Sequence, residues 1–255
     1  MTSYYDVKAM NASSIKKGAV SMLHMHHAMT EQSTQASAML RGSKLHMAVL
    51  EPEKLEKLQI CDNFRTKEYK ELCELYGKEN VVKSVELEEL KEISSIVREN
   101  SIIKELGLLI GGQAEKEIYW KGQVGSLGFD AKAKLDYLSD KFIVEYKTTN
   151  SLANFASAAA RMHYHLQLGW YQKAAMLAGK HNAEMFVIAQ ESSAPFDVAV
   201  FRVDGIMLED WYFQCVQIVK QYLSGDRRGA YPELMNFELP AWVDNSDDIF
   251  DLIEE

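Results

Sequence analysis

The chain has 255 residues, 47% of them hydrophobic and 25% charged, which is ordinary for a globular protein of one large domain or two small ones. The formal net charge of −9 speaks against nucleic acid as a partner unless basic residues gather locally. No apolar run approaches the roughly 18 residues of a membrane span, and the opening MTSYYDVKAM lacks the pattern of a secretory signal, so we expect a cytoplasmic protein without a membrane partner.

Hydrophobic periodicity predicts an α/β chain whose N-terminal part is helical. The predicted helices cover residues 12–27, 37–50 (closed by Pro52), 64–76, 85–106, 151–179 and 206–224. The predicted strands are EIYW, SLGFDAKAKLDYL, KFIVEYKTT and residues 183–190 and 197–203. We expect one domain over residues 1–243, mainly helical to residue 110 with its core from residue 111, and an acidic tail over 244–255.

Charge is unevenly distributed along the chain. The tail holds six acids and no base, and residues 86–92 form a second acidic block. The first fifty residues are locally basic through Lys8, Lys16, Lys17, Arg41 and Lys44. Since the local field matters more than the total, DNA stays open as a partner. Cys61, Cys73 and Cys215 are odd in number and lack a CxxC pair, which predicts reduced thiols.

The runs KAKLDYL and FIVEYKTT predict a hairpin that carries three charged side chains near its turn. Alternation places Asp136 opposite the apolar face of its strand, and it places Glu145 and Lys147 together on one face of the next strand. Turn residues Ser139 and Asp140 let the two acids converge. Converging oxygens suit Mg²⁺ or Mn²⁺, and Lys147 is placed to orient an attacking water. The alternative is a surface hairpin with a Lys–Glu pair worth under about 1 kcal/mol.

Further segments accompany this D-x8-E-x-K spacing over nearly the whole chain. They are MNASSIKK, RGSKLHMAVLEP, AEKEIYW, YHLQLGWY and LPAW. Together they resemble the PD-(D/E)xK nucleases of the YqaJ/RecB-like superfamily, specifically the RecE (exonuclease VIII) type related to lambda exonuclease. The departures are Lys134 and Leu135, where the family often has Arg and Pro, and Ser21–Met22 in place of Ser-Pro. Lys134 leaves a bidentate phosphate contact open to question.

The resemblance implies a restriction-endonuclease-like core, with a mixed central β-sheet flanked by helices. It implies metal ligands at His46, Asp136, Glu145 and the Tyr146 carbonyl, with Lys147 positioning the water. Gln167 and Tyr171, four residues apart on one helix face, would support catalysis. Residues implied or considered as substrate contacts are Ser13, Arg41, Glu115 (with Glu117 in reserve), Arg161 and Tyr164.

The implied activity is that of a Mg²⁺-dependent, double-strand-specific DNA exonuclease, with Mn²⁺ as a substitute. By the same resemblance it would act in a bacterium or phage-infected cell, digest the 5′-ended strand and hand the 3′ strand to an annealing protein of the RecT or beta type. Related exonucleases form rings, so we expect a cyclic homo-oligomer of three or four subunits with the N-terminal basic residues lining its channel. The alternatives are a catalytically silent DNA-binding or scaffold protein on this fold, and a RecB-like nuclease of other polarity. The iron–sulfur branch needs four cluster cysteines, and this chain has three.

Several residues keep a second interpretation. Ser13 and Arg161 are candidate contacts for a DNA end phosphate, and a helix cap or a surface position is the alternative for each. The HMHH run at 24–27 has no carboxylate spaced to complete a metal site, so we interpret it as solvated histidines. His163 and His165, which flank Tyr164, suit either a DNA contact or packing.

Overall fold

The structure is a computed structural model, and it describes residues 4–31, 37–231 and 233–234. The LPAW segment and the acidic tail over 244–255 lie outside the described residues. Among the helices of the described part, none is both long enough and apolar enough to cross a lipid bilayer.

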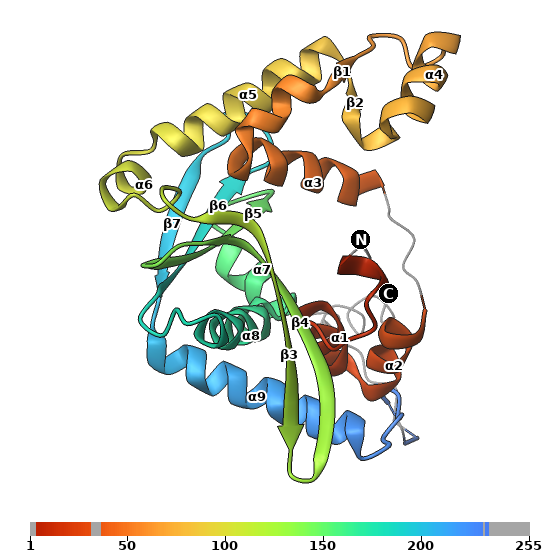
Figure 1. The fold of residues 1–255 in the computed structure, drawn as a ribbon, viewed down its shortest axis with the longest axis vertical. Coiled ribbons are helices and arrows are strands. Elements are labelled where there is room, and N and C mark those ends of the chain that lie inside the picture. Colours follow the sequence, from red (N-terminus) through yellow and green to blue (C-terminus); the bar gives the residue numbers. More distant parts are fainter. Residues whose placement is uncertain (1–3, 32–36, 232, 235–255) are drawn as a thin grey trace, which may run out of the picture.

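A five-stranded sheet of order β3-β4-β5-β6-β7 forms the centre of the molecule (Figure 1). Its strands are β3 (Gln113–Val124), β4 (Leu127–Leu138), β5 (Phe142–Thr149), β6 (Glu184–Glu191) and β7 (Val198–Val203). β5 and β6 pair parallel, whereas the other neighbours pair antiparallel. The sheet is therefore mixed, as the resemblance implied, and the two predicted C-terminal strands are confirmed.

Helices cover both faces of the sheet. The helices on one face are α1 (Ala12–Val20), α2 (Met22–Thr30), α7 (Phe155–Arg161), α8 (Tyr164–Leu177) and α9 (Gly205–Leu223), and those on the other are α3 (Ser37–Leu50), α5 (Ser84–Glu99) and α6 (Ser101–Leu106). The first core centres on Trp170, Ile143 and Leu135, and the second on Tyr146, Ile188 and Ile93. Each fully buried apolar side chain stabilises its core by about 1.5–3 kcal/mol. The α/β architecture with a helical N-terminal part is confirmed.

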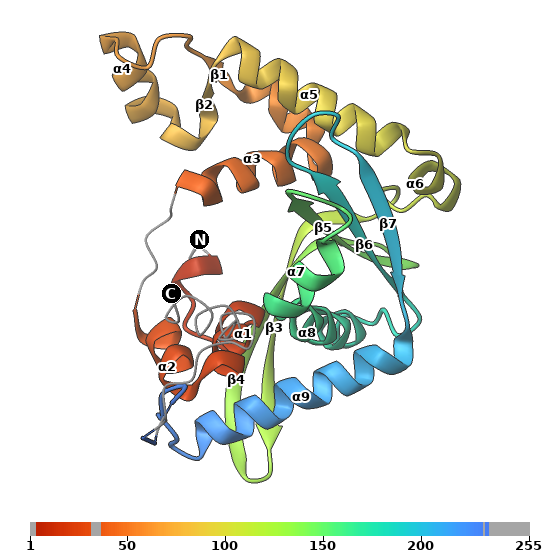
Figure 2. The ribbon, with the colours of Figure 1, turned by 180° about the vertical axis from the view of Figure 1, so that it is seen from behind.

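A small arm extends beyond α3 and α5, at the opposite end of the molecule from α9 (Figure 2). Its elements are η2 (Pro52–Lys57), β1 (Gln59–Ile60), α4 (Lys67–Tyr76), η3 (Lys78–Asn80) and β2 (Val81–Val82). β1 and β2 pair parallel in a two-stranded sheet that the sequence did not predict. Strands of two residues carry too little periodicity to be recognised.

Three predicted helices are each broken in two. Ser21 ends α1 and also begins α2, because its hydroxyl accepts a hydrogen bond from His24 N at 3.2 Å. Asn100 separates α5 from α6 in the same way, accepting from the amides of Ile102 and Ile103. Between α7 and α8, His163 takes a left-handed conformation with φ of 53°. Single helices over 12–27, 85–106 and 151–179 were therefore wrong, because side-chain caps interrupt the first two and the left-handed His163 interrupts the third.

The sheet opens between β4 and β5. Their ladder contains Tyr137 paired with Val144 and Leu138 paired with Ile143, and beyond these pairs the strands separate. Met10 takes the vacated edge of β4: its amide donates to Asp130 O at 2.9 Å, and its carbonyl accepts from Lys132 N at 2.8 Å. The opening leaves Asp136 of β4 and Glu145 of β5 without a strand pairing between them.

Candidate active site and metal centre

Asp136 lies on β4 where β5 departs. Its Oδ2 accepts a hydrogen bond from Tyr146 N at 2.9 Å, so the carboxylate replaces the lost strand pairing. His46, carried by α3, places Nδ1 3.5 Å from the same oxygen and packs edge-on against the Tyr146 ring at 5.0 Å. The structure thus brings together Asp136, His46 and Tyr146, which the sequence had separated by up to a hundred residues.

Glu115 joins this group from β3. The β3–β4 ladder pairs Ala114 with Tyr137 and Lys116 with Leu135, and it passes over the two residues between them, Glu115 and Asp136. Glu115 has a φ of 54°, a conformation rare for any residue with a side chain. Its carboxylate pairs with Lys134. Ligand atoms of Glu115, His46 and Asp136 lie within 4.8 Å of one another, a grouping able to hold a metal ion.

Glu117, the reserve for Glu115, lies outside this group. It is exposed on β3, and its Oε2 accepts from the Tyr119 hydroxyl at 2.8 Å. The structure therefore agrees with Glu115 as the acid of the AEKEIYW segment. The left-handed backbone of Glu115, which separates its surroundings from those of Glu117, was not predictable from the sequence.

Glu145 lies on the β5 side of the opening and is 1% exposed. Its Oε1 accepts from Lys147 Nζ and from Gln167 Nε2, the latter at 2.5 Å. The Gln167 amide also reaches the Tyr171 hydroxyl at 3.1 Å, so the pair predicted on one helix face acts together. The other oxygen, Glu145 Oε2, is buried without a hydrogen-bond partner. A buried carboxylate oxygen without a partner is costly, and a bound cation would supply that partner.

Lys16 is a member of the site that the sequence analysis assigned only to a general basic surface. Its Nζ donates to Gln167 Oε1 at 2.9 Å. Lys16 and Lys147 lie over the Tyr164 ring, at 5.3 Å and 5.2 Å from its centroid. The signal available in the sequence was its position in the MNASSIKK segment, three residues after Ser13.

The remaining predicted contacts are placed away from these hydrogen bonds. Ser13 is exposed on α1, whose capping box is formed by Asn11 and Ser14, so a capping role for Ser13 is wrong. Arg41 pairs with Glu89 at 2.6 Å and donates to Ser192 O at 3.2 Å. Arg161 is exposed and is the last residue of α7, so it does not cap the N-terminus of that helix.

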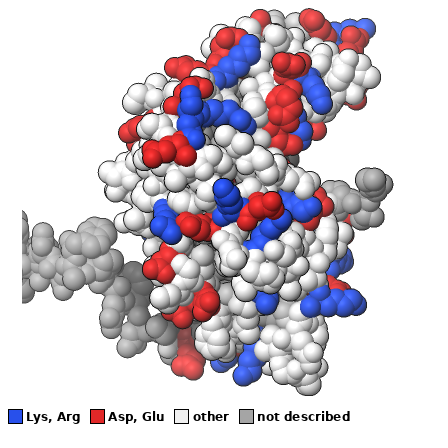
Figure 3. All heavy atoms as spheres, turned by 60° about the vertical axis from the view of Figure 1, so that its left-hand side comes forward, with Lys and Arg blue, Asp and Glu red and all other residues white. Residues whose placement is uncertain are grey.

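The basic residues of the N-terminal fifty do not form one free surface. Lys44 pairs with Glu86 of α5 at 2.8 Å, as Arg41 does with Glu89. On the face drawn in Figure 3, acidic and basic side chains are intermixed rather than gathered into separate regions. The acids of α5 therefore face these bases instead of lying on a separate outer surface.

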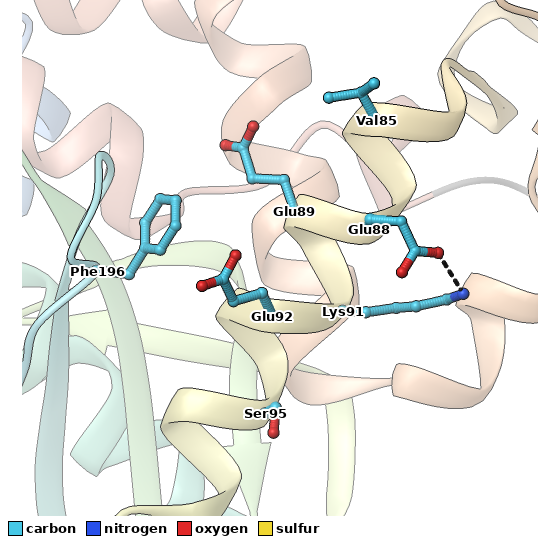
Figure 4. A pocket seen from close by; sticks show the side chains of 7 residues that line it. All are labelled: Val85, Glu88, Glu89, Lys91, Glu92, Ser95 and Phe196. Atoms are coloured by element: carbon cyan, nitrogen blue, oxygen red, sulfur yellow. Dashed lines mark hydrogen bonds and ion pairs between the residues drawn. The ribbon is translucent and has the colours of Figure 1, made fainter.

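The acidic block of α5 lines a hollow of its own, of about 680 Å³. In Figure 4, Glu89 and Glu92 project from α5 toward Phe196 of the β6–β7 loop, while Glu88 pairs with Lys91 at 2.8 Å. Its negative lining is unsuited to a polyanion. The hollow contains none of the residues around Asp136 and Glu145.

Burial acts on the pKa of four groups at the opening, Asp136, Glu145, His46 and Lys147. It raises the pKa of Asp136 to about 6, and together with the charge of Asp136 it raises the pKa of Glu145 to about 7. Burial and the charge of Lys147 lower the pKa of His46 to about 4, which leaves a neutral imidazole able to bind metal. Burial also opposes the charge of Lys147, but the attraction of Glu145 and Asp136 outweighs it and raises the pKa of Lys147.

The donor set fits a hard divalent cation. It offers carboxylate oxygens from Asp136, Glu115 and Glu145, with an imidazole nitrogen from His46, and carboxylates suit Mg²⁺ and Mn²⁺. A cation would favour ionisation of the two buried acids whose pKa values are raised, and it would offer a partner to Glu145 Oε2. The residues present therefore fit a hard divalent cation, and Mg²⁺ as the cofactor stays a prediction.

A family model described as a PDDEXK-like domain of unknown function (DUF3799) matches residues 10–232. The chain belongs to this family. The match supports the PD-(D/E)xK nuclease superfamily for this fold, and it does not distinguish the RecE type within it. No curated protein sequence matches the chain.

Two of the solved structures that match the chain differ in their degree of similarity to it. The crystal structure named “Putative exonuclease” from Eubacterium rectale gives a TM-score of 0.59 at 15% identity, over 97% of this chain and 93% of that chain. The structure of SSO0001 gives a TM-score of 0.35 at 14% identity, over 78% of this chain and 90% of that one, which is too low to support an argument. The first likeness agrees with the mixed sheet and its flanking helices.

Proposed function

We propose that this protein is a divalent-metal-dependent nuclease that hydrolyses DNA from the ends of a duplex. The observation that carries the proposal is the opening between β4 and β5, where Asp136 and Glu145 are buried beside Lys147 and Glu145 Oε2 has no partner. Two neighbouring buried acids destabilise a fold unless a bound ligand offsets their desolvation cost. A scaffold protein would therefore gain nothing from this arrangement. Strongly perturbed groups in one opening are typical of active sites.

His46, Glu115 and Asp136, whose ligand atoms converge, would hold the ion, and Glu145 offers a further oxygen. When bound, Mg²⁺ or Mn²⁺ would neutralise phosphate charge and lower the pKa of a water so that hydroxide forms near neutral pH. The neutral His46 imidazole needs no deprotonation to act as a ligand at pH 7.

Lys147 would position the attacking water and stabilise the negative charge that grows on the phosphate. Its raised pKa keeps the ammonium charged, and the Glu145 carboxylate fixes its position. A fixed ammonium can donate hydrogen bonds to the attacking water and to the phosphate oxygens, where negative charge grows in the transition state. Gln167 holds Glu145 Oε1, while Lys16 holds Gln167, so two further residues maintain this geometry.

We further propose the polarity and partners of the RecE and lambda exonuclease type: digestion of the 5′-ended strand, and transfer of the 3′ strand to an annealing protein. This narrower proposal rests on the resemblance, and one observation supports the resemblance. The segments MNASSIKK and RGSKLHMAVLEP, which carry the resemblance, contribute Lys16 and His46 to the same opening as Asp136 and Glu145. They lie at positions 10–17 and 41–52, far from the hairpin in sequence.

A direct test incubates linear duplex, single-stranded and closed circular DNA with the full chain in Mg²⁺ or EDTA. We expect degradation of linear duplex in Mg²⁺, none in EDTA, and no cutting of closed circles. Asp136→Asn should be inactive, while Glu117→Gln, a matched change on an exposed strand position, should retain activity. Absence of cleavage by the wild-type chain, with DNA binding retained, would overturn the proposal in favour of a silent DNA-binding protein.

A further inference from the structure

A cavity of about 580 Å³ adjoins the acidic opening and has no role in the chemistry described so far. Glu145, Lys147 and Gln167 of the opening line it, together with two further polar residues, His165 and Gln214. The rest of its wall is mainly apolar, with aromatic side chains from four elements: Phe155 of α7, Tyr164 of α8, Phe201 of β7 and Trp211 of α9. Its size and its mainly apolar lining with a few polar groups are those of a small-molecule site.

The aromatic side chains present ring faces and edges to this space. Phe155 and Phe201 stack at 5.4 Å with an interplanar angle of 19°, and Phe201 remains 40% exposed. Trp211 is half-buried and meets His165 edge-on at 5.9 Å. An exposed, oriented aromatic surface of this kind is ready to stack on a planar ligand.

The α7 wall leaves the cavity open. Its lining residues are Ala156, Ala159 and Ala160, which lie at i, i+3 and i+4 and so share one helix face. Alanine side chains end at Cβ, so no larger group from this face occupies the space. Ser157, on the same helix, is exposed and lies outside the lining.

We infer that this cavity binds the nucleobase of the nucleotide whose phosphate is attacked, an inference that rests on the proposed nuclease function. A phosphate held at Lys147 carries its own sugar and base within one nucleotide of that ammonium, and the aromatic cavity begins at the same residue. Base stacking on aromatic rings accepts every base, which suits a nuclease without sequence preference. A paired, stacked base cannot enter, so the site takes a nucleotide that has left the duplex.

The binding test needs no cleavage. The full chain is titrated in EDTA with deoxyadenosine 5′-monophosphate and, separately, with deoxyribose 5-phosphate, by calorimetry and by tryptophan fluorescence. We expect the nucleotide to bind on the order of tenfold more tightly than the sugar phosphate, since stacking supplies the difference. Equal affinities would overturn the inference.

A cavity-filling variant assigns that difference to this site. Ala160→Trp places a large side chain on the lining face at an exposed position, and we expect it to abolish the preference for the nucleotide. Ser157→Trp, the matched control on the same helix, should keep it. Melting temperatures of both variants establish that they fold. A preference that survives in a folded Ala160→Trp protein would place the base elsewhere and refute the inference.

A cleavage experiment separates this inference from the proposed function. Linear duplexes with an abasic analogue at the terminal nucleotides are compared with intact duplexes in Mg²⁺, and wild-type turnover of the abasic ends should fall on the order of tenfold. Cleavage of both substrates at the same rate would refute the nucleobase site and leave the proposed nuclease function supported. No cleavage of either would remove the nuclease proposal, and equal binding in the titration would then remove the base site as well.

Discussion

Replacing Lys147 by methionine removes the cation that faces Glu145 while keeping much of the side-chain volume. The Glu145 side chain is 1% exposed and the Lys147 side chain 15%, so water screens their pairing little. Removing one member of a buried pair leaves the other without compensation, which costs about 3–5 kcal/mol. We expect Lys147→Met to lose unfolding free energy of this size at pH 9 in EDTA.

The loss should shrink as the pH falls, because Glu145 can take up a proton. Burial and Asp136 already raise the pKa of Glu145 to about 7, and without Lys147 it should rise further. A carboxyl whose folded-state pKa exceeds its unfolded value contributes stability below the unfolded value, and this contribution is lost as the pH rises through the folded one. Each further pKa unit between the folded-state and unfolded-state values of Glu145 changes the free energy of unfolding by about 1.4 kcal/mol. The deficit of the variant should therefore grow from pH 6 to pH 9.

Urea unfolding followed by circular dichroism measures the effect in wild type, Lys147→Met, Glu145→Gln and the double variant. The double variant should recover to within about 1 kcal/mol of wild type, since neither charge is then buried alone. Lys121→Met, at a side chain 91% exposed, is the control and should change stability by no more than about 0.5 kcal/mol. A Lys147→Met protein as stable as wild type at pH 9, or one whose deficit shrinks as pH rises, would refute the reasoning.

Four further outcomes can be measured. Lys147→Ala should abolish cleavage while DNA-end binding, measured by anisotropy in Ca²⁺, largely survives; near wild-type turnover would contradict its role. Asp136→Asn should weaken Mn²⁺ binding at least tenfold by isothermal titration, and unchanged affinity would remove it from the ligand set. Linear duplex labelled at both ends should release 5′ label before 3′ label, with the reverse order pointing to another branch. Light scattering coupled to size exclusion should find three or four subunits; a mass of 29.0 kDa with and without DNA would end the ring proposal.

The hairpin was the most predictable part of the site. Alternation along two strands placed Asp136, Glu145 and Lys147 on the faces where the structure has them, because side-chain direction in a strand follows from residue parity. Convergence of the acids also followed from the short turn at Ser139. The opening of the sheet beyond Tyr137 was not predictable, since a change of strand partner leaves no mark in local periodicity.

The Lys147–Glu145 pair shows a second limit. From sequence alone Lys147 had no evident role besides chemistry, whereas the structure makes it the counter-charge of a buried acid. The left-handed backbone of Glu115 and the hydrogen bond from Lys16 to Gln167 were also inaccessible. Each depends on contacts between segments far apart in the chain, and propensity rules describe only neighbours.

The contact of Met10 with β4, and of Lys16 with Gln167 across 151 residues, has a consequence for the order of events during synthesis. At about 5–20 residues per second, on the order of ten seconds separate the emergence of Lys16 from that of its partner. The loop between Lys16 and Gln167 cannot close before Gln167 has been synthesised. Until then α1 lacks the surface of α8 against which it packs. The nascent chain consequently keeps Lys16 apart from Glu145 and Gln167, and the candidate site is complete only after residue 167 has left the ribosome.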